Sequence, residues 1–183
     1  MNITTEIIII LAIILVHAIF VLSEMSVASA RKARLQQRIN IGDRRANTVL
    51  QLIENPNLFL ATVQIGITFV GVFVGAVGGA LLVAPVRGLL ATVPALSQYA
   101  DSLSLTLVVI GITFVSIVLG ELVPKRIALH NPERIATILA GPMLFVSMLF
   151  KPFVWVLGKI TDFILKLLGI EPGTEPPVTE EEI

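Results

Sequence analysis

Three long apolar stretches decide what this sequence can fold into. They cover residues 7–30, 58–84 and 103–122, and each is long enough to cross a bilayer as a helix, which takes roughly 20 residues. Inside lipid the backbone has no water to bond, so each stretch must satisfy its own N–H and C=O groups by forming a helix. The sequence therefore predicts an all-α integral membrane protein with three transmembrane helices.

The composition supports a membrane protein and excludes several other classes. Of the 183 residues 55% are hydrophobic and only 14% are charged, with a mean hydropathy of +0.92. A soluble domain usually carries about 25% charged residues. The net charge is zero and no basic segment is interleaved with aromatic residues, so we expect no nucleic acid partner. The chain has no cysteine, which excludes disulfides and thiolate metal sites.

Basic residues follow the first and third stretches and predict the orientation of the chain. The first cluster is Arg31, Lys32, Arg34, Arg38, Arg44 and Arg45, and the second is Lys125, Arg126, His130 and Arg134. Positive loops stay in the cytoplasm, so we expect a multi-pass plasma (inner) membrane protein with its N-terminus outside and its C-terminus cytoplasmic. No basic residue precedes the first stretch, which is also longer than a signal-peptide core, so we expect it to be retained.

Residues 134–169 are apolar but interrupted by Pro142 and Pro152. After Pro152 the apolar residues share the helix with Lys159, Asp162 and Lys166, a pattern typical of helices that lie in the membrane interface. We therefore expect two helices forming a juxtamembrane hairpin on the cytoplasmic side. The alternative is a fourth span, which would place the C-terminus outside.

The end of the chain predicts a continuation into another domain. Residues 171–183 are rich in Pro and Glu, and residues 179–182 have the spacing of a helix capping box one residue before the chain stops. We expect residues 1–170 to form the membrane domain with its juxtamembrane helices. Residues 171–183 are then a linker toward a missing cytosolic domain.

Two patterns in the spans admit two interpretations each. Gly71, Gly75 and Gly79 repeat at the spacing that lets helix backbones approach closely, either within one chain or across a dimer. The hexapeptide IGITFV occurs at residues 65–70 and again at 110–115. Chance within a small apolar alphabet is the favoured explanation, and a pair of related transporter helices flanking one site is the alternative.

The third stretch ends in a pattern that predicts a cation site. Pro124 has no N–H, so the helical bond back to the Gly120 carbonyl cannot form, and we expect the span to break there. A carbonyl oxygen is then left beside the carboxylate of Glu121, and hard oxygen ligands suit Mg²⁺, Ca²⁺ or Na⁺. Thr113 and Ser116 lie on the same helix face as Gly120.

The other two spans also carry polar residues near their cytoplasmic ends. Ser23 and Ser26 share one face of the first span, which also contains Glu24, and Gln64 and Thr68 lie one turn apart in the second. The predicted cation site comprises Ser23, Ser26, Gly120 and Glu121, with Glu24, Gln64, Thr68, Ser116, Pro124 and Lys125 as additional candidates.

Each of these residues has a purely structural alternative. Ser and Thr in membrane helices often bond their own backbone, and Glu121 has Lys125 one turn away as an ion-pair partner. His17 has no polar partner three or four residues away, and we interpret it as a packed or interface histidine rather than a ligand. No catalytic triad, phosphate loop or His-x-x-x-His motif is present, so no enzyme activity is expected.

Several motifs carry a resemblance to a known family. Glu54-Asn55-Pro56, ATVQIGIT at 61–68, GELVPKRIAL at 120–129 and Asn131-Pro132-Glu133-Arg134 resemble the membrane domain of the CNNM/CorC family, whose members are also called hemolysin-C-like. The resemblance covers essentially the whole chain. It implies a homodimer with three spans per subunit, a juxtamembrane helical belt and cytosolic CBS domains. It also implies Mg²⁺ transport, mainly export, with Mg²⁺ as the bound substrate ion and Na⁺ as the coupling ion.

The resemblance also implies site residues, with one departure. Serines of span one, an Asn of span two and a Gly-Glu pair of span three face the ion in that family, and Ser23, Ser26, Gly120 and Glu121 match these positions. The Asn is absent here. Some relatives with the QIGIT pattern are linked to polyamine export, so an organic-cation exporter is the alternative to a Mg²⁺ transporter. A non-transporting scaffold or sensor is a third hypothesis, and buried carboxylates disfavour it because they are costly.

Overall fold

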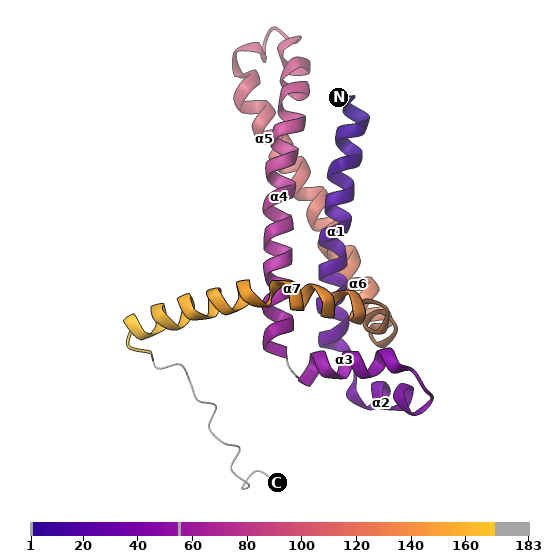
Figure 1. The fold of residues 1–183 in the computed structure, drawn as a ribbon. Coiled ribbons are helices and arrows are strands. Elements are labelled where there is room, and N and C mark those ends of the chain that lie inside the picture. Colours follow the sequence, from indigo (N-terminus) through magenta and orange to yellow (C-terminus); the bar gives the residue numbers. More distant parts are fainter. Residues whose placement is uncertain (1, 55, 171–183) are drawn as a thin grey trace.

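The computed structural model describes residues 2–54 and 56–170, and these are almost entirely helical, without strands. Two long helices, α1 (Ile3–Ser29) and α4 (Pro56–Ala91), run along the bundle. The third segment consists of α5 (Ala100–Val115), a π-helix (Ser116–Leu122) and α6 (Val123–His130) in direct succession (Figure 1). Each predicted span agrees, to within one residue at its end, with a helical segment that is long and apolar enough to cross a membrane. This confirms the prediction of an all-α membrane protein.

The second span is longer than predicted. The apolar stretch that predicted it ends at residue 84, but α4 continues through Pro85 to Ala91. One proline removes a single helical hydrogen bond, and the apolar residues after it continue the helix. A 3₁₀ turn, Ser97–Tyr99, precedes the third segment. Arg87 and Asp101, whose Nε and Oδ1 atoms are 2.6 Å apart, join the ends of α4 and α5.

The expected juxtamembrane hairpin is one continuous helix, α7 (Pro132–Leu167). Both Pro142 and Pro152 lie inside it, so the prediction that they separate two helices was wrong. α7 is also long and apolar enough to be a span, yet Figure 1 shows it crossing the lower ends of α1 and α4 instead of running beside them. Residues 171–183, the expected linker, lie outside the described residues.

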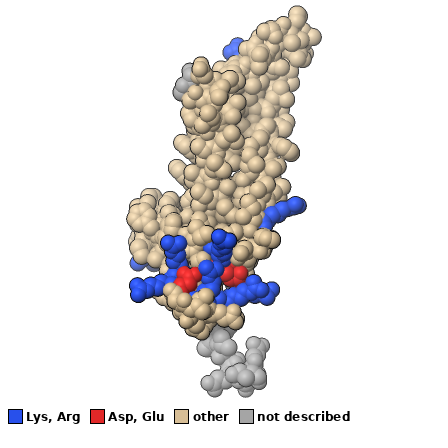
Figure 2. All heavy atoms as spheres, turned by 90° about the vertical axis from the view of Figure 1, so that its right-hand side faces the viewer, with Lys and Arg blue, Asp and Glu red and all other residues tan. Residues whose placement is uncertain are grey.

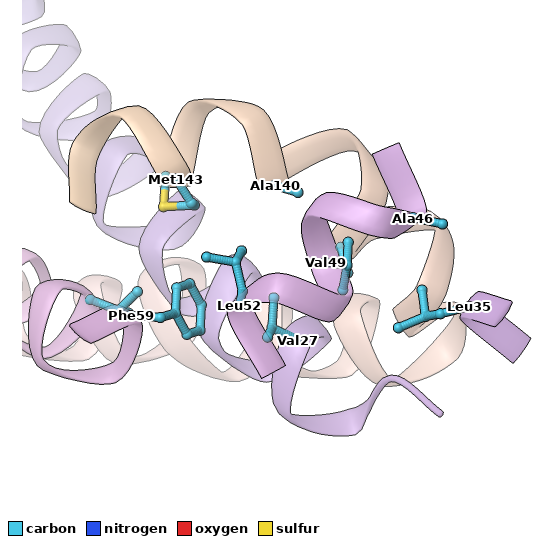
Figure 3. Packing of buried hydrophobic residues seen from close by; sticks show 10 residues of the cluster. Val27, Leu35, Ala46, Val49, Leu52, Phe59, Ala140 and Met143 are labelled. Atoms are coloured by element: carbon cyan, nitrogen blue, oxygen red, sulfur yellow. The ribbon is translucent and has the colours of Figure 1, made fainter. Parts of the chain in front are cut away.

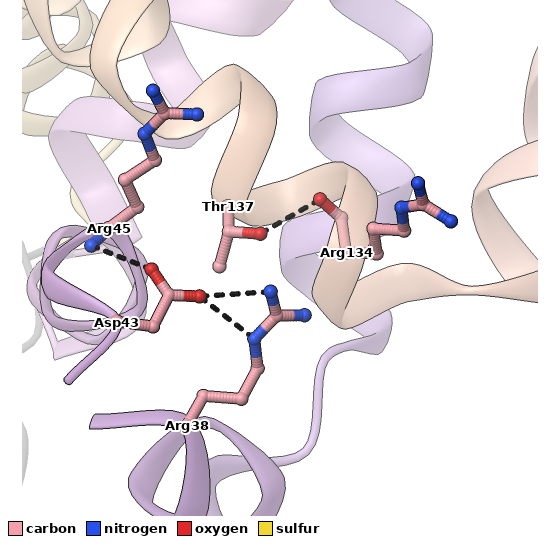
Figure 4. A network of polar contacts seen from close by, with 5 residues as sticks. All are labelled: Arg38, Asp43, Arg45, Arg134 and Thr137. Carbon is pink, nitrogen blue, oxygen red and sulfur yellow. Dashed lines mark hydrogen bonds and ion pairs between the residues drawn. The ribbon is translucent and has the colours of Figure 1, made fainter. Parts of the chain in front are cut away.

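Two short helices complete the lower end of the bundle. α2 (Lys32–Asn40) and α3 (Arg44–Glu54) are joined by a tight turn in which Gly42 has a φ of 94°, a value that favours glycine. Asp43 fixes this turn (Figure 4) because its Oδ2 lies 2.9 Å from Nη2 of Arg38 and its Oδ1 accepts the backbone N–H of Arg45. The second bond caps the start of α3.

A hydrophobic core joins α7 to these short helices and to the spans (Figure 3). Its buried members are Val27, Leu35, Ala46, Val49, Leu52, Phe59, Val63, Ala136, Ala140 and Met143. The contribution of α7 comes from its first half. No residue beyond Ser147 is buried in the described part of α7, so its second half extends away from the core. α7 therefore packs across the end of the bundle through small residues near its start.

Charge is concentrated at the end of the molecule that carries α2 and α3. On the face that Figure 2 shows, Lys and Arg gather there, whereas the long shaft of the bundle shows almost no charge. The shaft instead exposes large apolar side chains such as Phe69, Val72 and Phe114, each more than 60% exposed. An apolar shaft with one basic end is the surface expected of a membrane protein.

Candidate functional site

A polar cavity of about 210 Å³ lies between the three predicted spans. It is lined by His17 of α1, by Gly71, Val74 and Gly75 of α4, and by Ile112, Thr113, Ser116, Ile117 and Glu121 of the third segment. Polar and ionisable groups inside a membrane domain are costly and usually functional. The cavity therefore brings an imidazole, two hydroxyls and a carboxylate to one place among apolar helices.

The π-helix Ser116–Leu122 supplies the carboxylate side of this cavity. The N–H of Val123 bonds the carbonyl of Val118, five residues back instead of four. Pro124 follows immediately, and a proline cannot donate the α-helical bond to Gly120. The sequence predicted a break at this proline, but the helix widens by one residue per turn and continues as α6. Single π turns of this kind are frequent at functional sites.

His17 is held between two glycines from different spans. A Cβ at Gly120 would lie 3.2 Å from Cδ2 of His17, closer than nearly all Cβ contacts, and a Cβ at Gly71 would lie 3.6 Å from Cε1. The imidazole thus fills the space left by two absent side chains. Sequence reasoning did not include His17 in the site, because its neighbours lie on other helices and not three or four residues away in α1.

Two polar atoms at the cavity are buried without a partner. Within the described residues, neither Nδ1 of His17 nor Oγ of Ser116 has a hydrogen-bond partner. Leaving such a group unsatisfied costs about 1–3 kcal/mol. A site in which two polar atoms stay unsatisfied is suited to a ligand that forms the missing hydrogen bonds.

Glu121 is paired with Lys125 one turn further along. The Nζ of Lys125 donates to Oε1 of Glu121 at 2.6 Å, and the two side chains are 41% and 44% exposed. This is the structural alternative left open by the sequence. The exposed part of the carboxylate leaves room for an incoming cation, which would compete with the ammonium of Lys125 for Glu121.

The predicted serines of span one are buried but do not line the cavity. Ser26 donates its hydroxyl to the carbonyl of Ser23 at 3.1 Å, and Oγ of Ser23 has no partner among the described residues. Six residues of helix separate Ser23 from His17, which is about 9 Å along the axis. Glu24 is half-buried and does not line the cavity either.

The predicted residues of span two point elsewhere. Gln64 lines a separate groove of about 360 Å³ against the second half of α7, where Thr161 and Asp162 also lie. Thr68 is exposed and lines none of the cavities described here. Span two instead meets the cavity through Gly71 and Gly75. Of the predicted residues, Ser116 and Glu121 line the cavity. Gly120 lies against His17 and Lys125 is bonded to Glu121, whereas Pro124 does not line the cavity.

An apolar cavity of about 350 Å³ adjoins the polar one. Ile112 lines both, and the other walls of the apolar cavity come from α1, α4 and α5, including Ile14, Leu82 and Gly111. The two cavities together place the charged group of Glu121 next to an apolar volume. Within residues 2–54 and 56–170, no three His, Cys, Asp or Glu residues are grouped closely enough to hold a metal ion.

Comparisons with known proteins identify several relatives of this chain. The chain is 45% identical over 182 residues to a UPF0053 protein of Synechocystis sp., covering 100% of this chain and 41% of that protein. It is 36% identical to a polyamine export protein of Haemophilus influenzae, covering 95% of this chain and 40% of that protein. A polyamine export protein of Salmonella typhimurium is 33% identical, with 97% of this chain and 40% of that protein covered.

These relatives are longer than the chain, which spans about two fifths of their length. The model of one family, described as the cyclin M transmembrane N-terminal domain, matches residues 7–183. The match includes the three predicted spans, the π-helix with its Gly-Glu pair and the whole of α7. The chain therefore belongs to the CNNM family and corresponds to the transmembrane domain of its members.

Proposed function

We propose that this domain transports a small cation, which binds in the polar cavity at Glu121. The observation that carries the proposal is the carboxylate of Glu121 beside two buried polar atoms without partners, Nδ1 of His17 and Oγ of Ser116. A cation neutralises the carboxylate, and bound water or an N–H group satisfies the other two atoms. Two relatives that carry the name polyamine export protein support a transport role.

We propose a primary-amine cation of the polyamine class as the cargo. Lys125 already places an alkylammonium on Oε1 of Glu121 at 2.6 Å, so the carboxylate is in position to bind the same chemical group on a ligand. The adjoining apolar cavity at Ile112 suits the methylene chain of such a ligand. A polyamine thus matches both the charged and the apolar part of the site.

Mg²⁺ is the second candidate cargo, with Na⁺ as the coupling ion. It is favoured by the oxygens of Glu121, Thr113 and Ser116 around one cavity, because Mg²⁺ prefers oxygen ligands and retains several of its waters. A single carboxylate is a weak basis for selecting a small divalent ion. We therefore rank Mg²⁺ below an amine cation as the proposed cargo.

We further propose that two copies form a homodimer through the face on which the cavity opens. Gly71 and Gly75 are exposed on that face, and a Cβ at Gly75 would meet nothing within 4 Å. A polar cavity facing hydrocarbon would be unfavourable, so a second copy is a suitable cover. The mass of the detergent-solubilised protein tests this.

The basic end of the bundle supports a cytoplasmic location for α2 and α3, with the N-terminus outside. A single cysteine at Ser97 should then react only from outside and one at Asn40 only from inside, since the chain has no other cysteine. A cytosolic CBS-type domain after residue 170 is consistent with the greater length of the relatives. The resemblance is the basis for that domain.

Transport in proteoliposomes distinguishes the cargoes. We expect putrescine flux above the rate of empty liposomes, and less flux of Mg²⁺, each measured with and without a Na⁺ gradient. Flux of Mg²⁺ alone would reverse the order of the two candidates. No flux of either cation, from correctly folded protein, would contradict the transport proposal.

A further inference from the structure

A second cavity, of about 740 Å³, lies where α6 ends and α7 begins. It is outside the polar cavity at Glu121 and shares no residue with it. Its walls combine two kinds of side chain: the polar residues Arg126, His130, Asn131 and Arg134, and the isoleucines Ile127, Ile135 and Ile138. We call it the basic cavity.

The positive charges of the basic cavity are not neutralised within the described residues. Arg126 and Arg134 form no ion pair there, and no carboxylate lines the cavity. Glu133 is adjacent in sequence but buried, and its oxygens face the backbone N–H of Arg31 at 3.4 Å and the guanidinium of Arg34 at 3.7 Å. The basic cavity therefore presents net positive charge.

The apolar part of the basic cavity faces outward. Ile127 and Ile138 are 50% and 54% exposed, although each lies beside an arginine that lines the cavity. α6 directly continues the third span, and α7 crosses the end of the bundle (Figure 1). The basic cavity thus lies at the junction between the apolar shaft and the basic end of the molecule seen in Figure 2.

We propose that the basic cavity binds the headgroup of an anionic phospholipid. The guanidinium groups of Arg126 and Arg134 would hold the phosphate, for which arginine has a fitting planar array of donors. Ile127 and Ile138 would contact the start of an acyl chain. Basic pockets between membrane helices on the cytoplasmic side bind lipid headgroups in this way.

The outward-facing isoleucines favour a lipid over a soluble phosphate. A free phosphate would satisfy the arginines and leave Ile127 and Ile138 exposed, whereas a phospholipid covers both. The volume also lies in the range of about 300–1,000 Å³ that is usual for bound small molecules. A bound headgroup would contact both helices beside Asn131, the residue where the chain turns from α6 into α7.

Native mass spectrometry of the full chain in detergent tests the proposal, with phosphatidylglycerol and phosphatidylcholine as probes. We expect phosphatidylglycerol to bind at least about tenfold more tightly than phosphatidylcholine. The double variant R126Q/R134Q should lose this preference. R44Q/R45Q removes the same charge from α3, outside the basic cavity, and should keep the preference.

Three outcomes would overturn the proposal. R126Q/R134Q with an unchanged preference would place the lipid elsewhere. An equal loss of the preference in R44Q/R45Q would indicate that the whole basic end of the molecule attracts phosphatidylglycerol, without a specific site in the basic cavity. Displacement of phosphatidylglycerol by inorganic phosphate at equal concentration would indicate a site for soluble anions.

A second variant keeps the test decisive if R126Q/R134Q does not fold. R126K/R134K retains both charges but lacks the paired donors of arginine. It should bind phosphatidylglycerol several-fold more weakly while its phosphatidylcholine binding stays the same. An unchanged affinity for phosphatidylglycerol in this variant would contradict binding of the phosphate by the two arginines.

Discussion

The imidazole of His17 lies directly against Gly120, so that a Cβ at position 120 would be 3.2 Å from Cδ2 of the ring. This contact joins α1 to the π-helix that carries Glu121. The glycine before the carboxylate is therefore needed for the space that it leaves to the ring. Any side chain there must displace the ring that forms one wall of the polar cavity.

Gly120→Ala should push the His17 ring out of place. We expect a loss of about 1–3 kcal/mol in stability, as for other overpacked sites, together with reduced putrescine transport. Gly88→Ala is the control, because Gly88 lines neither the polar nor the apolar cavity and a Cβ there meets nothing within 4 Å. That variant should be neutral, or more stable by up to about 1 kcal/mol. Thermal unfolding in detergent measures both, and equal effects would contradict the tight contact.

His17→Leu should raise the stability of the protein and lower its affinity for the cation. It removes a buried nitrogen that has no partner in the described structure, so stability should rise by about 1 kcal/mol. Cation binding should fall because the same nitrogen is then missing from the cavity wall. Thermal unfolding and calorimetry with putrescine check the two effects. A fall in stability with unchanged binding would make His17 a packing residue only.

Lys125→Met removes the internal ammonium that occupies Glu121. We expect putrescine to bind several-fold more tightly, since it no longer competes with the lysine for Oε1. Removing the ammonium also leaves the carboxylate of Glu121 without its ion-pair partner, so the ligand-free protein should lose stability. Calorimetry gives the affinity. Weaker binding in this variant would mean that Lys125 supports the site instead of competing for it.

Gly75→Leu tests the dimer face. Space around Gly75 is open within one chain, so the subunit fold should tolerate the larger side chain. If two copies meet there, the detergent-solubilised protein should shift toward the mass of a monomer. Gly88→Leu, at another open position in α4, should leave the mass unchanged. An unchanged mass for both variants would move the interface away from Gly75.

The spans were predictable from the sequence because lipid leaves an apolar chain few alternatives to a helix. Glu121 was also recognisable, since an ionisable group in a span is expensive. Whether a helix ends at a proline or continues through it was not predictable from the sequence. Locally, Pro124 is compatible with a break or with a widened turn, and Pro142 with a hairpin or a continuous helix. Tertiary packing decides, as Ala136 and Ala140 fit α7 against the core of the bundle.

The cavity walls were only partly predictable for a related reason. His17 meets Gly71 and Gly120, which come from two other spans, so no local spacing reveals the contact. Ser23 was predicted from depth and resemblance, yet depth does not fix which way a side chain faces around the helix. The same limit applies to Gln64, which faces α7.

The most direct test of the account is putrescine transport by Glu121→Gln in proteoliposomes, with Glu24→Gln as the matched control. Both substitutions keep the shape of the side chain and remove one charge from the membrane domain. Only Glu121 lines the polar cavity. We predict that Glu121→Gln loses at least about 90% of the flux, since an amide lacks the charge that attracts a cation, while Glu24→Gln retains most of it. Wild-type flux in Glu121→Gln would contradict a cation site at this carboxylate.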